Sequence, residues 1–158
     1  TNQLISDINK HLKDELAKKN IEVATIPATS NFDKENLMSD WSHRHVAYIA
    51  GLGTFGINNM LITDKGSAGR IGTVVTNVDL DPSEKITEER CLTKAGYNCN
   101  VCVNRCVTDA LSESEFDRFS CYDFLLENDS KHPEMELTDV CGKCCVDLPC
   151  SFKNPLAN

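Results

Sequence analysis

The chain has 158 residues, a length typical of one domain with a real core, and its 41% hydrophobic and 25% charged content excludes wholesale disorder. No apolar run approaches about 18 residues, so no membrane-spanning helix is expected, and no secretory signal is visible. The net charge of −8 disfavours nucleic acid as a partner, because Lys and Arg must neutralise its phosphates.

The first half of the chain predicts alternating helices and strands. An apolar residue recurs every four positions from Leu4 to Leu16, which predicts an amphipathic helix over 2–19 with Thr1 as its cap. The further expected elements are a strand over 21–27, a loop over 29–40 ending in a cap near Asp40, a helix over 41–53, and β-rich segments over 59–63 and 70–80. This α-β-α-β-β order precedes every cysteine.

The second half has less regular periodicity. Two short helices are expected, over 101–111 and 115–128, and in the latter Cys121 shares a face with Phe124 and Leu125, so its sulfur should point inward. Between Glu113 and Asp139 there are nine acidic residues and two basic ones. Such a run is typical of a solvated surface, and it would also suit the docking of a basic protein partner.

All nine cysteines lie between residues 91 and 150. The odd count and the long cysteine-free first half argue against a disulfide framework. A reducing compartment, which we expect to be the cytoplasm, and metal ligation fit better. A region with so few large aliphatic residues would need bound metal to hold it together.

The segment NCNVCVNRCVTDAL contains Cys99, Cys102 and Cys106 at the spacing of a bacterial iron–sulfur motif. The leading cysteine of that motif is replaced by Gly96, and the proline after its last cysteine by Val107. A C-x2-C turn directs two sulfurs at one cluster, whereas in two-cluster ferredoxins the next cysteine ligates the other cluster.

This crossing rule distributes eight cysteines over two [4Fe–4S] clusters. The first set is Cys91, Cys99, Cys102 and Cys150, and the second set is Cys106, Cys121, Cys141 and Cys144. Cys91 takes the ligand role of the motif's missing leading cysteine, because the loop between Cys91 and Cys99 is short enough to bring the two together. Cys145 is left over and is the alternative to its neighbour Cys144.

Zinc is the main rival interpretation. Two C-x2-C pairs, Cys99 with Cys102 and Cys141 with Cys144, could form a structural site of four thiolates. That arrangement leaves five cysteines without a role.

The segment GLGTFG, residues 51–56, matches G-x-G-x-x-G. A dinucleotide site requires a strand before this motif and a helix after it, and here the expected order is reversed. The glycines therefore predict either a tight turn at a helix end or a close approach of backbone to a cofactor.

Residues 40–155 resemble the epoxyqueuosine reductase family and its relatives, which include corrinoid reductive dehalogenases. The resemblance is carried by HVAYIAGLGTFGINNMLITDKGSAGRIGTVVTNVDLDP followed by the cysteine set. It implies an α+β fold in which a nitroreductase-like α/β part binds a cobalamin and a ferredoxin-like part with two [4Fe–4S] clusters supplies electrons. By this resemblance Gly53, Gly56 and Asn58 would lie against the corrinoid. We expect a relative rather than a queuosine enzyme, because the family's tRNA-binding repeats have no counterpart here.

We therefore expect a nitroreductase-like part over 1–88 and a two-cluster part over 89–158. Three functions are considered: an electron-transfer protein, a complete corrinoid- or flavin-dependent small-molecule reductase with its cofactor at the Gly51–Gly56 turn, either within one chain or across a homodimer, and a metal-stabilised interaction domain. The expected partners are a redox protein or a small-molecule acceptor, with no nucleic acid and no membrane.

Overall fold

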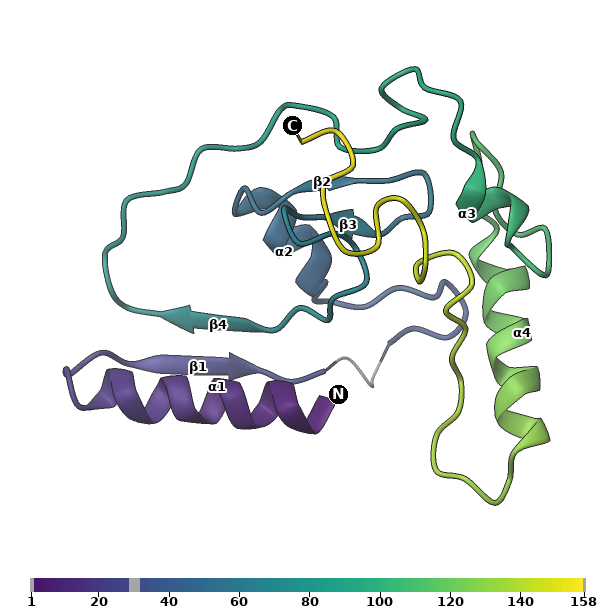
Figure 1. The fold of residues 1–158 in the computed structure, drawn as a ribbon. Coiled ribbons are helices and arrows are strands. Elements are labelled where there is room, and N and C mark those ends of the chain that lie inside the picture. The colour runs from purple at the N-terminus through teal and green to yellow at the C-terminus, as the bar shows by residue number, and fades with distance from the viewer. Residues whose placement is uncertain (1, 29–31, 158) are drawn as a thin grey trace. The chain divides into compact units, whose positions relative to one another are not determined.

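The computed structural model describes residues 2–28 and 32–157 (Figure 1). These residues form helices and two small antiparallel sheets, which confirms the α+β class. They divide into two compact units. The first unit comprises 1–52 and 69–86, and the second comprises 53–68 and 87–158. The predicted boundary near residue 88 differs from this division because residues 53–68 pack with the cysteine-bearing half.

The first unit is built on the strands β1 (Val23–Ile26) and β4 (Thr73–Thr76), which pair in antiparallel register from Val23 opposite Thr76 to Ile26 opposite Thr73. Helix α1 (Asn2–Ala17) contacts β1. The predicted cap, Thr1, lies outside the described residues, as do residues 29–31 of the predicted loop.

The apolar stripe of α1 does not face the sheet. Leu4 is 61% exposed and Ile8 51%, whereas Asn9 is buried. A two-stranded sheet is narrow, so it covers only the side of the helix that carries Asn9. The helix was predicted correctly, and the stripe that predicted it stays largely exposed to solvent.

Helix α2 (His43–Ile49) is shorter than the predicted 41–53, and its cap is Ser42 rather than Asp40. The Ser42 side chain accepts the N–H of His45. The imidazole of His43 contacts the Thr73 hydroxyl at 2.7 Å and the Pro27 carbonyl at 3.1 Å, which ties α2 to the ends of both strands. The chain leaves α2 through Gly51, where φ is +74°.

The second unit opens with a short hairpin of β2 (Thr54–Phe55) and β3 (Leu61–Ile62). The predicted strands over 59–63 and 70–80 therefore shrink to β3 and β4, and they pair with β2 and β1 rather than with each other. Asn59, with φ +56°, lies in the turn that joins β2 to β3.

Two helices follow in the second unit. Helix α3 (Val101–Asn104) is much shorter than the predicted 101–111, and the chain turns at Asp109, where φ is +53°. Helix α4 (Arg118–Lys131) begins where the Asp117 carboxylate accepts the N–H groups of Phe119 and Ser120. The core of this unit contains Cys102, Leu111 and Leu148. Partly buried residues pack against this core, three of them cysteines: Ile57, Val101, Val103, Cys106, Cys144 and Cys150.

No helix among residues 2–28 and 32–157 is both long enough and apolar enough to cross a membrane. All nine cysteines are free thiols.

Candidate functional site

A cavity in the second unit is lined by four thiols that come from three separate segments. Cys91 follows the irregular segment after β4, Cys99 lies just before α3 and Cys102 within it, and Cys150 belongs to the loop near residue 150. The rest of the lining is mostly apolar and includes Ile62, Val101 and Leu148. This cavity thus gathers the first predicted ligand set.

Burial controls the chemistry of these thiols. It raises the pKa of Cys102 to about 11, and the neighbouring thiols Cys91 and Cys150 add to the shift. Burial also raises the pKa of Cys150. The Ser67 hydroxyl, 3.7 Å from the Cys150 sulfur, acts to lower it. Such thiols stay protonated unless a cation compensates the charge, and soft thiolates are the donors that iron–sulfur clusters and zinc prefer. The donor set therefore fits such a group.

The loop between Cys91 and Cys99 closes on itself. The N–H of Ala95 donates to the Cys91 carbonyl at 2.9 Å, and Gly96 adopts φ +88°. The Thr93 hydroxyl donates to the carbonyl of Cys99. The position where the iron–sulfur motif would carry its leading cysteine is thus a left-handed turn, and Cys91 stands in the cavity instead.

Cys150 is held by the turn that follows β3. The N–H groups of Ser67 and Ala68 donate to the carbonyls of Cys150 and Ser151 at 2.9 Å each. A Cβ at Gly66 would lie 2.3 Å from the Ser151 carbonyl oxygen, and φ there is +85°. Only glycine lets the two backbones approach this closely.

Members of the second predicted set affect one another's pKa. Burial raises the pKa of Cys144 to about 11, and the neighbouring thiols Cys145, Cys121, Cys141 and Cys106 add to the shift. Burial likewise raises the pKa of Cys121, with Cys106 and Cys141 as the next causes. Cys121 is partly buried on α4, on the side of Phe124 and Leu125 that was predicted to face inward.

Cys106 differs from the other thiols of this group. Burial acts to raise its pKa, but the N–H groups of Thr108, Leu111 and Ala110 and the Thr108 hydroxyl are directed at the sulfur, and the net result is a lowered pKa. Amide donors around a sulfur stabilise an anionic thiolate, as they do in metal–sulfur sites.

Cys145 also lies near this group. Burial raises its pKa, and Cys141 is the next cause. Its sulfur points at the Gly142 carbonyl oxygen at 3.6 Å, as a thiol donor would. We therefore keep Cys144 as the predicted ligand and Cys145 as its alternative.

The zinc interpretation would combine Cys99 and Cys102 with Cys141 and Cys144. Cys99 and Cys102 line the first cavity, whereas Cys141 and Cys144 belong to the second group. Within the described part of the chain, no three His, Cys, Asp or Glu side chains lie close enough together to hold a single metal ion.

The three residues predicted to touch a corrinoid have contacts within the chain. A Cβ at Gly53 would lie 2.1 Å from the Ile62 carbonyl oxygen, and one at Gly56 would lie 2.7 Å from Oδ1 of Asn58. Asn58 is buried, and its amide donates to the Cys144 carbonyl at 2.5 Å. Asn58 also lines the first cavity. A cofactor contact at these residues remains a prediction.

No family model matches the sequence, and no curated protein matches it. Solved structures do match. Epoxyqueuosine reductase from Bacillus subtilis has a TM-score of 0.65 at 21% identity, over 95% of this chain and 38% of that chain. An epoxyqueuosine reductase solved with a tRNA stem loop has a TM-score of 0.65 at 20% identity, over 95% and 38% of the two chains. The enzyme from Streptococcus thermophilus has a TM-score of 0.58 at 19% identity, over 98% and 41%.

This chain shares the fold of part of the epoxyqueuosine reductases. It spans about two fifths of the length of those proteins.

Sequence reasoning missed the residues that hold the cysteines in place, above all Arg90 and Glu89 before Cys91, and Ser67 beside Cys150. Arg90 is the 7%-exposed cation immediately before a ligand candidate. A charged residue in a run such as TEERC carries no sequence signal of burial, so no pattern could have identified it.

Proposed function

We propose that the chain is a relative of epoxyqueuosine reductase that transfers electrons through two [4Fe–4S] clusters. The observation that carries the proposal is the gathering of four thiols from three segments around one apolar cavity, together with a second group that includes Cys106, Cys121, Cys141 and Cys144. The first cluster would be held by Cys91, Cys99, Cys102 and Cys150. The second would be held by Cys106, Cys121, Cys141 and Cys144. Bound clusters would supply one-electron oxidation and reduction.

On this proposal the protein's own residues exclude water from the first cluster and fix its ligands. Ile62, which is fully buried, and Leu148 line the cavity, and burial in apolar surroundings is one of the factors that set cluster potentials. On this proposal most of the second unit would be the ferredoxin-like part, and the first unit would be a reduced nitroreductase-like part. The cytoplasm would keep such thiols reduced.

Metal analysis and spectroscopy test this proposal. Protein purified without oxygen is expected to be brown, to contain about eight irons in two clusters of four, and to lose visible absorption with dithionite. The reduced protein should give an electron paramagnetic resonance signal from paramagnetic clusters. Colourless protein with one tightly bound zinc would support the interaction-domain alternative and overturn the proposal.

A second candidate function is a complete small-molecule reductase that uses a corrinoid or a flavin. It is favoured by one observation: Ile57 and Asn58, which directly follow the glycine-rich segment, line the same cavity as the four thiols. A cofactor at that segment would lie beside the first cluster. Cluster-dependent reduction of added cobalamin by the reduced protein separates this function from simple electron transfer.

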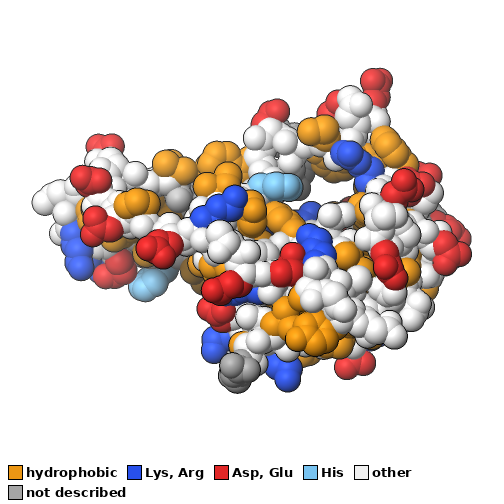
Figure 2. Space-filling view, turned by 90° about the horizontal axis from the view of Figure 1, so that it is seen from above, with side chains coloured by type: hydrophobic (Ala, Val, Ile, Leu, Met, Phe, Trp, Pro, Cys, Tyr) orange, Lys and Arg blue, Asp and Glu red, His pale blue; other side chains and the backbone are white. Residues whose placement is uncertain are grey.

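The charge of the second unit bears on its partner. Helix α4 and its flanks carry acidic residues together with exposed apolar ones, among them Phe119, Leu126 and Leu137. In Figure 2 red acidic side chains gather along the right-hand margin, with hydrophobic ones between them. We propose a basic redox protein as partner, because charge complementarity steers association.

One of the similar structures holds a tRNA stem loop, which points to the opposite kind of partner. The acidic surface predicts that this chain does not bind such a stem loop at about 0.15 M salt. Reduced protein should instead transfer electrons to a basic acceptor such as cytochrome c, at a rate that falls as salt is added. Fluorescence anisotropy with a labelled stem loop and stopped-flow spectroscopy measure the two results. Tight stem-loop binding, or a rate independent of salt, would contradict this assignment.

A further inference from the structure

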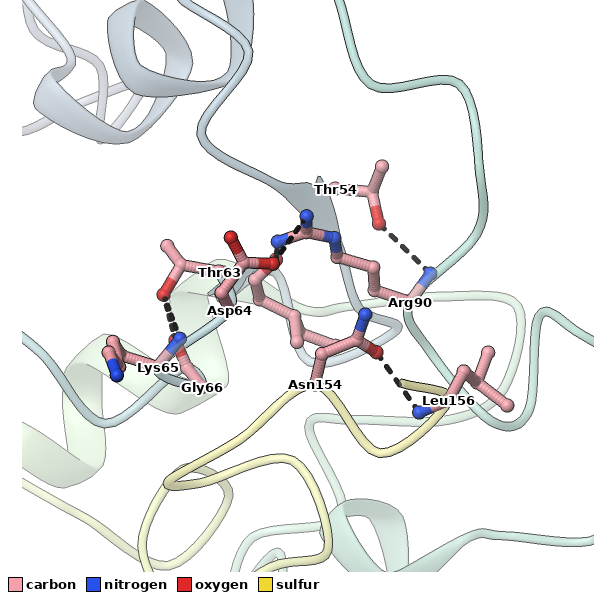
Figure 3. Close-up of polar contacts among 9 residues, drawn as sticks. Thr54, Thr63, Asp64, Lys65, Gly66, Arg90, Asn154 and Leu156 are labelled. Carbon is pink, nitrogen blue, oxygen red and sulfur yellow. Dashed lines mark hydrogen bonds and ion pairs between the residues drawn. The ribbon is translucent and has the colours of Figure 1, made fainter. Parts of the chain in front are cut away.

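Arg90 is a buried cation in the second unit. Its side chain is 8% exposed, and its Nη2 lies 2.8 Å from Oδ1 of Asp64, whose own side chain is 80% exposed. Its Nη1 donates to the Ile62 carbonyl at 3.3 Å. Figure 3 shows the Arg90 side chain extended toward Asp64. A buried charge is costly to desolvate, and here its ionic partner stands in solvent.

The main chain around Arg90 is fastened to the β2–β3 hairpin. The N–H of Arg90 donates to the Thr54 hydroxyl at 3.1 Å, a contact drawn in Figure 3, and to Oε1 of Glu89 at 2.9 Å. The next N–H, that of Cys91, donates to the same carboxylate oxygen at 3.0 Å. With the bond from Arg90 to Ile62, these contacts fix the position from which Cys91 reaches the cavity.

The charge of Arg90 lies close to that cavity in chain and in space. Arg90 precedes Cys91, and the Ile62 residue that accepts its hydrogen bond is 0% exposed and lines the cavity with the thiols. In such a low-dielectric surrounding a fixed charge acts strongly. The opposing charge of Asp64 is exposed to water and partly screened, so it cancels only part of the Arg90 charge.

Resting on the function proposed above, we propose that Arg90 has two roles at the first cluster: it positions Cys91, and it raises the cluster's reduction potential. A [4Fe–4S] core held by four thiolates is anionic, and it becomes more negative when it takes up an electron. A buried cation stabilises the more negative, reduced form. Arg90 is thus a positioning residue that also sets a redox property.

The test compares three variants by anaerobic redox titration, followed by electron paramagnetic resonance, with iron analysis alongside. Arg90→Met removes the charge and keeps an apolar side chain, Arg90→Lys keeps the charge, and Asp64→Asn removes the exposed counter-charge. Lys94→Met is the matched control, because Lys94 lies on the same loop and its ammonium donates to the Phe55 carbonyl at 2.6 Å, yet it is exposed.

We expect Arg90→Met to lower the potential of the first cluster and leave that of the second unchanged. Arg90→Lys should retain most of the wild-type potential, Asp64→Asn should raise it, and Lys94→Met should leave it unchanged. Where Arg90→Met fails to hold the first cluster, the positioning role is supported, and the charge role then depends on Asp64→Asn and Arg90→Lys.

Three results would overturn the inference. If the Arg90→Met protein holds both clusters and the reduction potential of its first cluster is unchanged, Arg90 has neither role. Equal shifts in Arg90→Lys and Arg90→Met mean that packing rather than charge is responsible. An unchanged potential in Asp64→Asn contradicts the charge role. Wild-type protein without iron would instead mean that the proposed function itself fails.

Discussion

Replacing Cys91 by serine is expected to halve the iron content of the protein, from about eight irons to about four. Cys91 lies in the first cavity with three other thiols, and it occupies the role that the motif would give to position 96. A serine hydroxyl is a harder ligand than a thiolate and does not suit a soft iron–sulfur site. Iron and sulfide analysis of anaerobically purified variants measures the loss.

The second cluster should survive this change, because none of its four predicted ligands lines the first cavity. Cys145→Ser provides the control, since it removes another thiol, a partly buried one, but should retain about eight irons. Iron loss in Cys145→Ser with full retention in Cys144→Ser would show that the wrong member of that pair was chosen. Full retention in Cys91→Ser would contradict the first ligand set.

Removing the clusters is expected to unfold the second unit. The fully or nearly buried aliphatic residues of this unit are few, and its hydrophobic cluster contains Leu111 and Leu148 packed with cysteines. Deep burial of a large aliphatic side chain stabilises by only about 1.5–3 kcal/mol. A structural metal site, by comparison, contributes on the order of 10 kcal/mol to folding. Without metal the thiols leave the core poorly filled.

Hydrogen exchange followed by mass spectrometry measures this effect in the full chain. After oxidative removal of iron with a chelator present, peptides from 87–157 should lose nearly all protection, including those of α4. Peptides from β1 and β4 are the internal control, since their pairing lies in the first unit and involves no cysteine. Equal protection of α4 with and without iron would show that the apolar core is sufficient.

Sequence patterns predicted the two long helices better than the short helices and the strands. The four-residue apolar repeat of α1 and the shared face of Cys121, Phe124 and Leu125 in α4 are local signals, and both helices form close to their predicted ranges. The two-residue strands β2 and β3 are not locally encoded. They form because Gly53 lets its backbone approach Ile62, a contact between residues that no period relates.

That Cys99 and Cys102 line one cavity could be expected from spacing, because a C-x2-C turn directs two sulfurs to one side whatever the surrounding fold. The residues that surround the cysteines could not be predicted from the sequence. Whether Arg90 is buried depends on the position of the Ile62 carbonyl, 28 residues earlier in the chain. The exposure of the α1 stripe was equally hidden, since it depends on the width of the sheet beneath.

Cys150 forms one wall of the first cavity, and it comes after every other cysteine in the chain. During synthesis on the ribosome, Cys91, Cys99 and Cys102 would emerge tens of residues before this wall exists. An iron donor acting on the nascent polypeptide would meet an open, three-sided site. Cluster delivery would therefore have to wait until the segment around Cys150 has also left the exit tunnel.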